Sequence, residues 1–245
     1  MLYSAKYKFI YSKSVKTAST STEAALEYLI RDDFAAHATN SKLYPDGSRI
    51  GYRGSNKEED PNFNTSAFSL NHQSLKETKN MIGSDTFDES FKISSIRNPY
   101  DQFISRFHFF SKQKVPEFID LKQNGRTDEI KKRFTSYVKN SKTASYDGKA
   151  HFFCNSEMLI DKFVRMESIT SDIEEIFDHL KVPKEISQII ISRFPKLKIT
   201  KRADSPLNYS DYYTEETLGI VNKTLSFWFD LGSYVRCQSI EELKD

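Results

Sequence analysis

The sequence has little of what marks a membrane protein or a disulfide-stabilised protein. Its two cysteines, Cys154 and Cys237, lie far apart and lack the spacing of metal ligands. Such sparse use fits a reducing compartment better than a disulfide framework. No apolar run approaches a membrane span, and a strand pattern within the first ten residues leaves no room for a signal peptide. We therefore expect a soluble cytoplasmic protein without a membrane anchor.

The chain also has almost no net charge. Its 36 Lys and Arg residues are balanced by 34 Asp and Glu residues, which gives +2. No overall field therefore argues for nucleic acid as a partner, and any basic site must be local. With 245 residues, 38% of them hydrophobic, the chain can bury a sizeable core. We expect a single domain spanning residues 1–245.

Strand and helix patterns alternate along the chain, which is typical of an α/β protein. Residues 6–11 predict a strand and residues 22–34 a helix. Residues 75–82 predict a second helix that ends at Gly83, and residues 91–96 predict a second strand. Each of the two predicted strands leads into a turn of unusual composition.

The first turn lies within residues 12–22, where a loop of lysines and hydroxyl side chains joins the strand to the helix. Unpaired amides at a helix N-terminus, the helix dipole and a lysine such as Lys16 together bind a phosphate-like group. A capping box between Thr20 and Glu23 is the structural alternative, and it is compatible with an anion site. We expect Lys13 to be a solvated charge at the strand end.

The second turn begins at Arg97, at the carboxyl end of the second predicted strand. Asn98 suits the N-cap of the next helix and Pro99 its first position. Ligands of open α/β sheets bind at this end of the strands, where an arginine can hold a phosphate bidentately. Ser105 lies about two helical turns further along. Taken alone, such a turn is more often structural.

Together the two turns resemble the sulfotransferase family that uses 3′-phosphoadenosine 5′-phosphosulfate, in particular the carbohydrate O-sulfotransferases and their bacterial relatives. Residues 16–21 match the family's loop for the 5′-phosphosulfate. Residues 97–105 match its 3′-phosphate motif, including the eight-residue offset from arginine to serine. The resemblance extends over about residues 7–235. Val15 departs from it, because the family usually has proline before the lysine.

The resemblance implies a three-layer α/β sandwich with a mainly parallel central sheet and P-loop NTPase-like topology. It implies 3′-phosphoadenosine 5′-phosphosulfate as the donor, adenosine 3′,5′-bisphosphate as the product, no metal, and an acceptor hydroxyl on a carbohydrate or other small molecule. The residues expected to contact the donor are Lys16, Thr17, Ala18, Ser19, Thr20, Ser21, Arg97, Ser105, Lys201 and Arg202.

Two of the residues carry catalytic expectations. Lys16 is the candidate that stabilises negative charge on the leaving phosphate. His72 is the candidate general base, because it precedes a predicted helix N-terminus whose dipole lowers the pKa of the imidazole. The alternatives are a carboxylate base, with His72 as a structural residue at the helix entry. His151 either lines the acceptor pocket or packs in the core.

Two other functional classes are compared with this one. A nucleotide or small-molecule kinase is a distant second, because the loop lacks the Gly-x-x-x-x-Gly-Lys pattern. A polyanion-binding module would use residues 112–150, which hold ten Lys or Arg against five Asp or Glu. That segment either steers an acidic acceptor or forms a solvated helical face.

Overall fold

The computed structural model describes residues 1–31, 42–51, 72–114, 117–140, 148–195 and 207–244. Its contacts divide the chain into two compact units, and each is described by itself. Unit 1 comprises Met1–Ile96 and Gly148–Lys198, and unit 2 comprises Arg97–Asp147 and Ile199–Asp245. The single domain over residues 1–245 stays a prediction.

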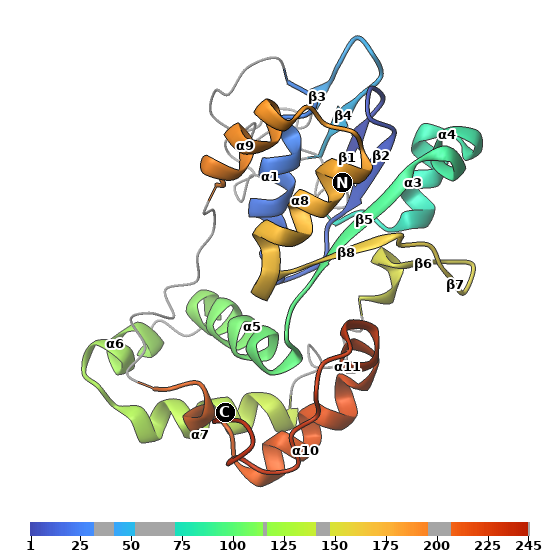
Figure 1. Ribbon diagram of the computed structural model, residues 1–245. Coiled ribbons are helices and arrows are strands. Elements are labelled where there is room, and N and C mark those ends of the chain that lie inside the picture. The colour runs from blue at the N-terminus through green and yellow to red at the C-terminus, as the bar shows by residue number, and fades with distance from the viewer. Residues whose placement is uncertain (32–41, 52–71, 115–116, 141–147, 196–206, 245) are drawn as a thin grey trace. The chain divides into compact units, whose positions relative to one another are not determined.

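Unit 1 is built on a six-stranded sheet (Figure 1). In spatial order its strands are β3 (Lys42–Leu43), β4 (Arg49–Ile50), β1 (Leu2–Ser4), β2 (Phe9–Ser12), β5 (Phe91–Ile96) and β8 (Lys162–Arg165). The three longer strands β2, β5 and β8 run parallel, and the short strands β1, β4 and β3 extend the sheet in antiparallel fashion. The predicted α/β class with a mainly parallel sheet is therefore confirmed. The three-layer arrangement and P-loop-like topology stay predictions.

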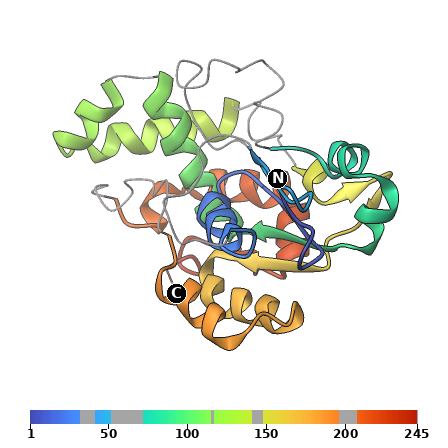
Figure 2. The same cartoon turned by 90° about the horizontal axis from the view of Figure 1, so that it is seen from above.

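Three helices pack on one face of this sheet: α1 (Ser19–Glu27), α8 (Ile169–His179) and α9 (Lys184–Ser192) (Figures 1 and 2). Side chains alternate across a strand, so Phe9 and Tyr11 of β2 face these helices together with Ile93 of β5. The helices contribute Leu26, Ile173, Ile176, Phe177 and Ile190 to the same core. This core fixes the orientation of β2 and β5, and therefore the direction in which the turns after these strands leave the sheet.

Unit 1 also contains α3 (Leu75–Ile82), α4 (Ser84–Glu89) and a small hairpin of β6 (Phe153–Cys154) and β7 (Glu157–Met158). The hairpin lies beside α3 in both views (Figures 1 and 2). A reciprocal capping box between Ser74 and Glu77 starts α3. Gly83 ends it with a φ of 87°, as the sequence predicts.

Unit 2 is helical in its described part. Its helices are α5 (Pro99–Lys114), α6 (Glu117–Gln123), α7 (Thr127–Asn140), α10 (Glu215–Thr224) and α11 (Ser226–Gly232). Phe107, Phe134 and Tyr212 contact one another edge to face in its core. The backbone leaves helical geometry at Leu225 and separates α10 from α11. Among the described helices of both units, none has the length and apolarity to cross a membrane.

Candidate active site

Both of the unusual turns leave the same edge of the sheet. Parallel β2 and β5 pair in a register that sets Ser12 opposite Ser94. Their carboxyl ends therefore lie at one edge, where open α/β sheets bind ligands. The lysine and hydroxyl loop, residues 13–18, follows β2. Arg97 is the first residue after β5.

The loop is held in a conformation that side chains other than glycine rarely adopt. Lys16 has a φ of 62° and Ala18 a φ of 58°, both in the left-handed region. Ala18 is the N-cap of α1, and no side chain caps that helix end. The capping box expected between Thr20 and Glu23 is therefore wrong, because α1 begins at Ser19, before Thr20. Backbone amides around left-handed residues at a helix N-terminus form a cradle for an anion.

Hydroxyl side chains hold the loop in this shape. The Ser14 hydroxyl donates to the carbonyl of Ser95 at 2.5 Å and lies 2.7 Å from the Thr17 hydroxyl. The Ser19 hydroxyl donates to the Ser14 carbonyl at 2.6 Å. Thr17 and Ser19 therefore use their hydroxyls to shape the loop. Of the predicted donor contacts, Thr17, Ser19 and Ser21 are buried, whereas Lys16, Ala18 and Thr20 are half-buried.

Lys13 is not the solvated charge that the sequence suggested. Its side chain is 1% exposed, and its ammonium lies 3.0 Å from the carboxylate of Glu23, whose side chain is fully buried. The pair joins the first residue of the loop to the second turn of α1. Burial of a charged pair is costly unless both partners are in place, so this contact fixes how the loop meets the helix.

His72 is attached to the start of the same loop. Its Nδ1 lies 3.0 Å from the carbonyl oxygen of Lys13. A carbonyl only accepts, so Nδ1 carries the proton and Nε2 has a lone pair in the neutral ring. Burial lowers the pKa of His72 to about 4, against a smaller opposing effect of the hydrogen bond to Lys13. The predicted lowering is present, but burial is its main cause rather than a helix dipole.

His151 packs beside His72 and is itself buried at 3% exposure. The two rings meet edge to face with their centroids 6.2 Å apart. The His151 Nδ1 lies 3.3 Å from the carbonyl oxygen of Gln73, and burial lowers the pKa of His151. His151 thus supports the backbone that carries His72, in line with the packing interpretation.

Because buried histidines must take up protons when the chain unfolds, we expect stability to fall in mild acid. Burial lowers the pKa of His108, in unit 2, to about 4, as it does for His72. The unfolded chain then binds more protons between about pH 6.5 and pH 4, so the free energy of unfolding decreases as pH falls through that window. Each of the two contributes at most about 3 kcal/mol at pH 4. Urea titrations at pH 7, 6, 5 and 4 measure the loss.

The matched variants for this experiment are His108→Gln and His179→Gln. His108 is buried and its Nε2 lies 2.6 Å from the Tyr212 hydroxyl, whereas His179 is exposed. The His108 variant should be less stable at pH 7 but lose less stability on acidification. A pH dependence identical in all three proteins would show that buried histidines do not govern it.

Arg97 is oriented by its own helix. Its Nε donates to a carboxylate oxygen of Asp101 at 2.5 Å, and a second guanidinium nitrogen contacts the same oxygen. Asn98 accepts a hydrogen bond from the backbone amide of Tyr100 at 3.0 Å, which confirms it as the cap of α5. Ser105 is 2% exposed. Lys201 and Arg202 lie outside the described residues.

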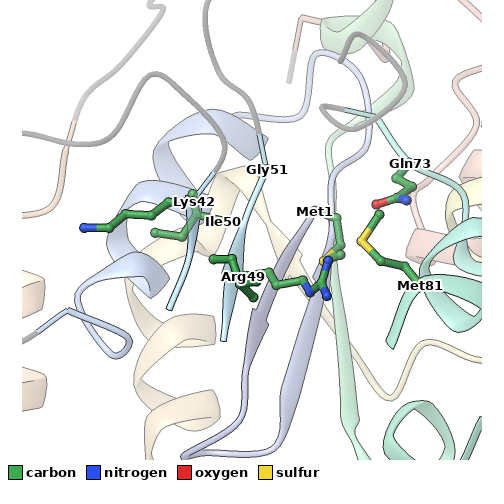
Figure 3. A pocket seen from close by; sticks show the side chains of 8 residues that line it. Met1, Lys42, Arg49, Ile50, Gly51, Gln73 and Met81 are labelled. Carbon is green, nitrogen blue, oxygen red and sulfur yellow. The ribbon is translucent and has the colours of Figure 1, made fainter. Parts of the chain in front are cut away.

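A pocket of about 340 Å³ lies in unit 1, and Gln73, the residue after His72 in the sequence, is part of its lining (Figure 3). It is lined by Met1, Lys42, Leu43, Arg49, Ile50, Gly51, Gln73 and Met81. None of these residues belongs to a recognisable sequence motif, so none was predicted as a site residue. Two polar residues from distant segments, Arg49 of β4 and Gln73, therefore line the same pocket. Gln73 directly follows the candidate base His72.

The basic segment over residues 112–150 is partly neutralised. Arg126 pairs with Glu129, Arg133 with Glu129 and Glu117, and Lys139 with Glu216. Paired surface charges attract a distant anion weakly, so a solvated helical face is favoured over steering. The part of the chain that the structure describes contains no group of three or more His, Cys, Asp or Glu side chains placed to hold a metal ion.

Comparison with known proteins identifies the family. Residues 1–223 match the model of the sulfotransferase family. No curated protein and no solved structure matches the chain. The match includes both unusual turns, the loop after β2 and the turn after β5. The chain belongs to the sulfotransferase family and is, as a member, a transferase of sulfuryl groups.

Proposed function

We propose that this enzyme transfers the sulfuryl group of 3′-phosphoadenosine 5′-phosphosulfate to a hydroxyl group of a carbohydrate acceptor. The observation that carries the proposal is the loop from Lys16 to Ser21. It combines a lysine, two left-handed residues and a helix N-terminus without a side-chain cap. This combination suits the doubly charged phosphosulfate end of such a donor. A kinase is not favoured, because the matched family transfers sulfuryl groups.

The donor's two anionic ends call for two sites. In this proposal the backbone amides of Thr17, Ala18, Ser19 and Thr20 bind the 5′-phosphosulfate, whereas the amide of Ser21 donates to the carbonyl of Ala18. Arg97 and Ser105 bind the 3′-phosphate, with Lys201 and Arg202 as further cations. Arg97 offers a guanidinium already oriented by Asp101, and guanidinium groups bind phosphate oxygens bidentately. The hydroxyls of Thr17 and Ser19 keep the loop in shape while their amides face the anion.

The donor supplies an activated sulfuryl group. The sulfur forms a bond to the acceptor oxygen and breaks its bond to the bridging oxygen, which leaves with the electron pair as part of adenosine 3′,5′-bisphosphate. The Lys16 ammonium stabilises the charge that grows on that oxygen. The Nε2 of His72 accepts the acceptor's proton, because Nδ1 is occupied by the Lys13 carbonyl.

Calorimetric titration with nucleotides tests the donor site. We expect adenosine 3′,5′-bisphosphate to bind more tightly than ATP with magnesium, because Arg97 and Ser105 select the 3′-phosphate. Arg97→Ala should weaken the bisphosphate by about tenfold or more, in line with loss of a charge-assisted hydrogen bond. Arg126→Ala is the matched control, since Arg126 is an exposed arginine of unit 2. A preference for ATP with magnesium would contradict the proposal.

Replacing the candidate base tests the role of His72. We expect His72→Asn to lower kcat by about a hundredfold, because an amide accepts no proton at neutral pH. The acid limb of the parent's kcat/KM profile should reflect the pKa of His72, about 4 in the free protein, and should be absent from the variant. His179→Asn serves as the control. If the variant kept the parent's acid limb, the base would be another group, such as a carboxylate.

A further inference from the structure

A buried chain of hydroxyl groups joins the end of β5 to the start of α1. The strands β2 and β5 are parallel neighbours, and α1 packs on the face of the sheet toward which Tyr11 points (Figure 1). On that face the Tyr11 hydroxyl lies 2.5 Å from the hydroxyl of Ser95. Both residues are fully buried. Neither belongs to residues 16–21 or 97–105, which carry the resemblance to donor-binding motifs.

Each end of this hydroxyl chain reaches a backbone carbonyl at the start of α1. The Tyr11 hydroxyl lies 3.3 Å from the carbonyl oxygen of Ser19. The Ser95 hydroxyl lies 3.5 Å from that of Thr22, which lies 3.4 Å from the carbonyl oxygen of Ala18. Each hydroxyl has one proton to donate. The protons therefore run either from Ser95 through Tyr11 to the Ser19 carbonyl, or the opposite way to the Ala18 carbonyl.

These two carbonyls belong to peptide units whose amides lie at the anion site. The Ala18 carbonyl shares a peptide plane with the amide of Ser19, and the Ser19 carbonyl shares one with the amide of Thr20. A hydrogen bond to a carbonyl fixes the plane and polarises the amide on its other side, which makes that amide a stronger donor. The hydroxyl chain therefore orients two of the four amides that the proposed function assigns to the 5′-phosphosulfate.

Ser95 also holds the loop through its backbone. Its carbonyl accepts the hydrogen bond from Ser14, and the Ser14 hydroxyl lies 2.7 Å from that of Thr17. Ser14 and Thr17 are fully buried as well. One residue of β5 thus contacts the start of α1 with its hydroxyl and the preceding loop with its carbonyl. Because Ser95 is buried, its influence on a bound anion passes through these contacts.

We propose that Ser95 and Tyr11 are positioning residues for the 5′-phosphosulfate of the donor, which act through the peptide units of Ala18 and Ser19. The inference rests on the proposed function, because it names the residues that hold the amides for that group. We expect a selective defect when either hydroxyl is removed. Binding at the 5′ end of the donor weakens and binding at the 3′ end does not, whereas general damage to the fold affects both ends.

Calorimetric titration of the full chain with two mononucleotides tests this selectivity. Adenosine 5′-monophosphate represents the 5′ end of the donor, and adenosine 3′-monophosphate represents the 3′ end. Ser95→Ala and Tyr11→Phe should each weaken the 5′-monophosphate by about three- to tenfold, the effect of one hydrogen bond. Both variants should bind the 3′-monophosphate as the parent does. Unchanged 5′ binding, or equal weakening of both nucleotides, overturns the proposal.

Ser94→Ala is the matched control. Ser94 precedes Ser95 on β5, is also fully buried, and donates its hydroxyl to the carbonyl of Ser12 at 2.7 Å. Its side chain lies on the opposite face of the sheet, because side chains alternate along a strand. Ser94→Ala should therefore lose about as much stability in urea as Ser95→Ala and bind both mononucleotides as the parent does. A selective 5′ defect in the Ser94 variant overturns the assignment to the hydroxyl chain.

Hydrogen exchange of the free protein separates this proposal from the donor proposal beneath it. The amides of Ser21 and Thr22 donate to the Ala18 carbonyl at 2.9 and 3.2 Å. In Ser95→Ala these amides should exchange about three- to tenfold faster, and in Ser94→Ala at the parent's rate. If exchange accelerates but the parent binds neither nucleotide, the donor proposal fails and the ordering of the helix start by Ser95 stands. If the parent binds the nucleotides but exchange is unchanged, the positioning role fails and the donor site stands.

Discussion

Lys16→Ala should lower the single-turnover rate of sulfuryl transfer by about 10²–10³-fold, the effect of losing one preorganised donor to a developing negative charge. The chain should keep its fold, because the Lys16 side chain is half-buried and both lysine and alanine must adopt the same left-handed φ of 62° at this position. Rapid-quench measurement at saturating donor gives the rate, and thermal unfolding gives the stability.

Two controls accompany this variant. Lys6→Ala removes an exposed lysine that precedes β2 and should leave the rate unchanged. Lys16→Arg keeps the charge but moves it, so it should recover only part of the rate. A Lys16→Ala enzyme that transfers sulfate at the parent rate would remove Lys16 from the mechanism.

Glu23→Gln should destabilise the fold by about 3–5 kcal/mol, because it leaves the buried ammonium of Lys13 without its counter-charge. The two side chains are 0% and 1% exposed and lie 3.0 Å apart. Urea unfolding at pH 7 measures the loss. The expected decrease is a large fraction of the stability of an ordinary domain.

The double variant Lys13→Met/Glu23→Gln distinguishes a broken pair from a damaged core. Removing both charges should restore part of the stability, since apolar replacements of buried pairs are often neutral or better. The recovery is incomplete because the N-terminal ammonium of Met1, 3.5 Å from Oε1 of Glu23, also loses its partner. Glu27→Gln is a comparison on the same helix, because Arg31, the partner of Glu27, is 13% exposed. Glu27→Gln should lower the free energy of unfolding by less than Glu23→Gln does. Equal losses in the Glu23 and Glu27 variants would contradict the special cost of the Lys13 pair.

Local signals explain which elements the sequence predicts well. The helix over residues 75–82 and the strand over residues 91–96 occur at those bounds. A capping box and a stop glycine fix the helix within a few residues of sequence. Residues 22–34 predicted a helix that the structure places at Ser19–Glu27. The helix begins earlier than predicted because Ala18 adopts a left-handed conformation as its N-cap. An alanine in the sequence does not indicate such a conformation.

The short strands were missed for a different reason. β3 and β4 have two residues each, too few for an alternating pattern, and they form because β1 offers an edge to pair with. The strands β7 and β8 lie close together in the chain but belong to different sheets. Pairing with distant strands decides these boundaries, and such pairing leaves no local trace in sequence.

The candidate-site residues also fall into two groups, those that belong to local motifs and those whose surroundings depend on distant contacts. Lys16, His72 and Arg97 were predicted as site residues because they belong to local motifs that resemble a family. Lys13 was misjudged, because its partner Glu23 lies ten residues away on the next element and was itself interpreted as a cap.

The pocket residues depend on tertiary placement alone. Arg49 lies in a segment with no periodic pattern, and its place in the pocket lining follows from pairing between β4 and β1. Gln73 is notable only because its amide oxygen is buried without a partner among the described residues.

The left-handed backbone at Lys16 and Ala18 has a consequence for the speed of ligand capture. A glycine-rich phosphate loop samples many shapes and closes on its ligand, whereas side chains at both positions restrict this loop to few shapes. Its conformational entropy is therefore lost when the chain folds and not when the ligand arrives. The association rate constant should therefore be high for an anion whose shape fits the preformed loop. Anions of another shape should bind poorly, because the loop does not adapt to them.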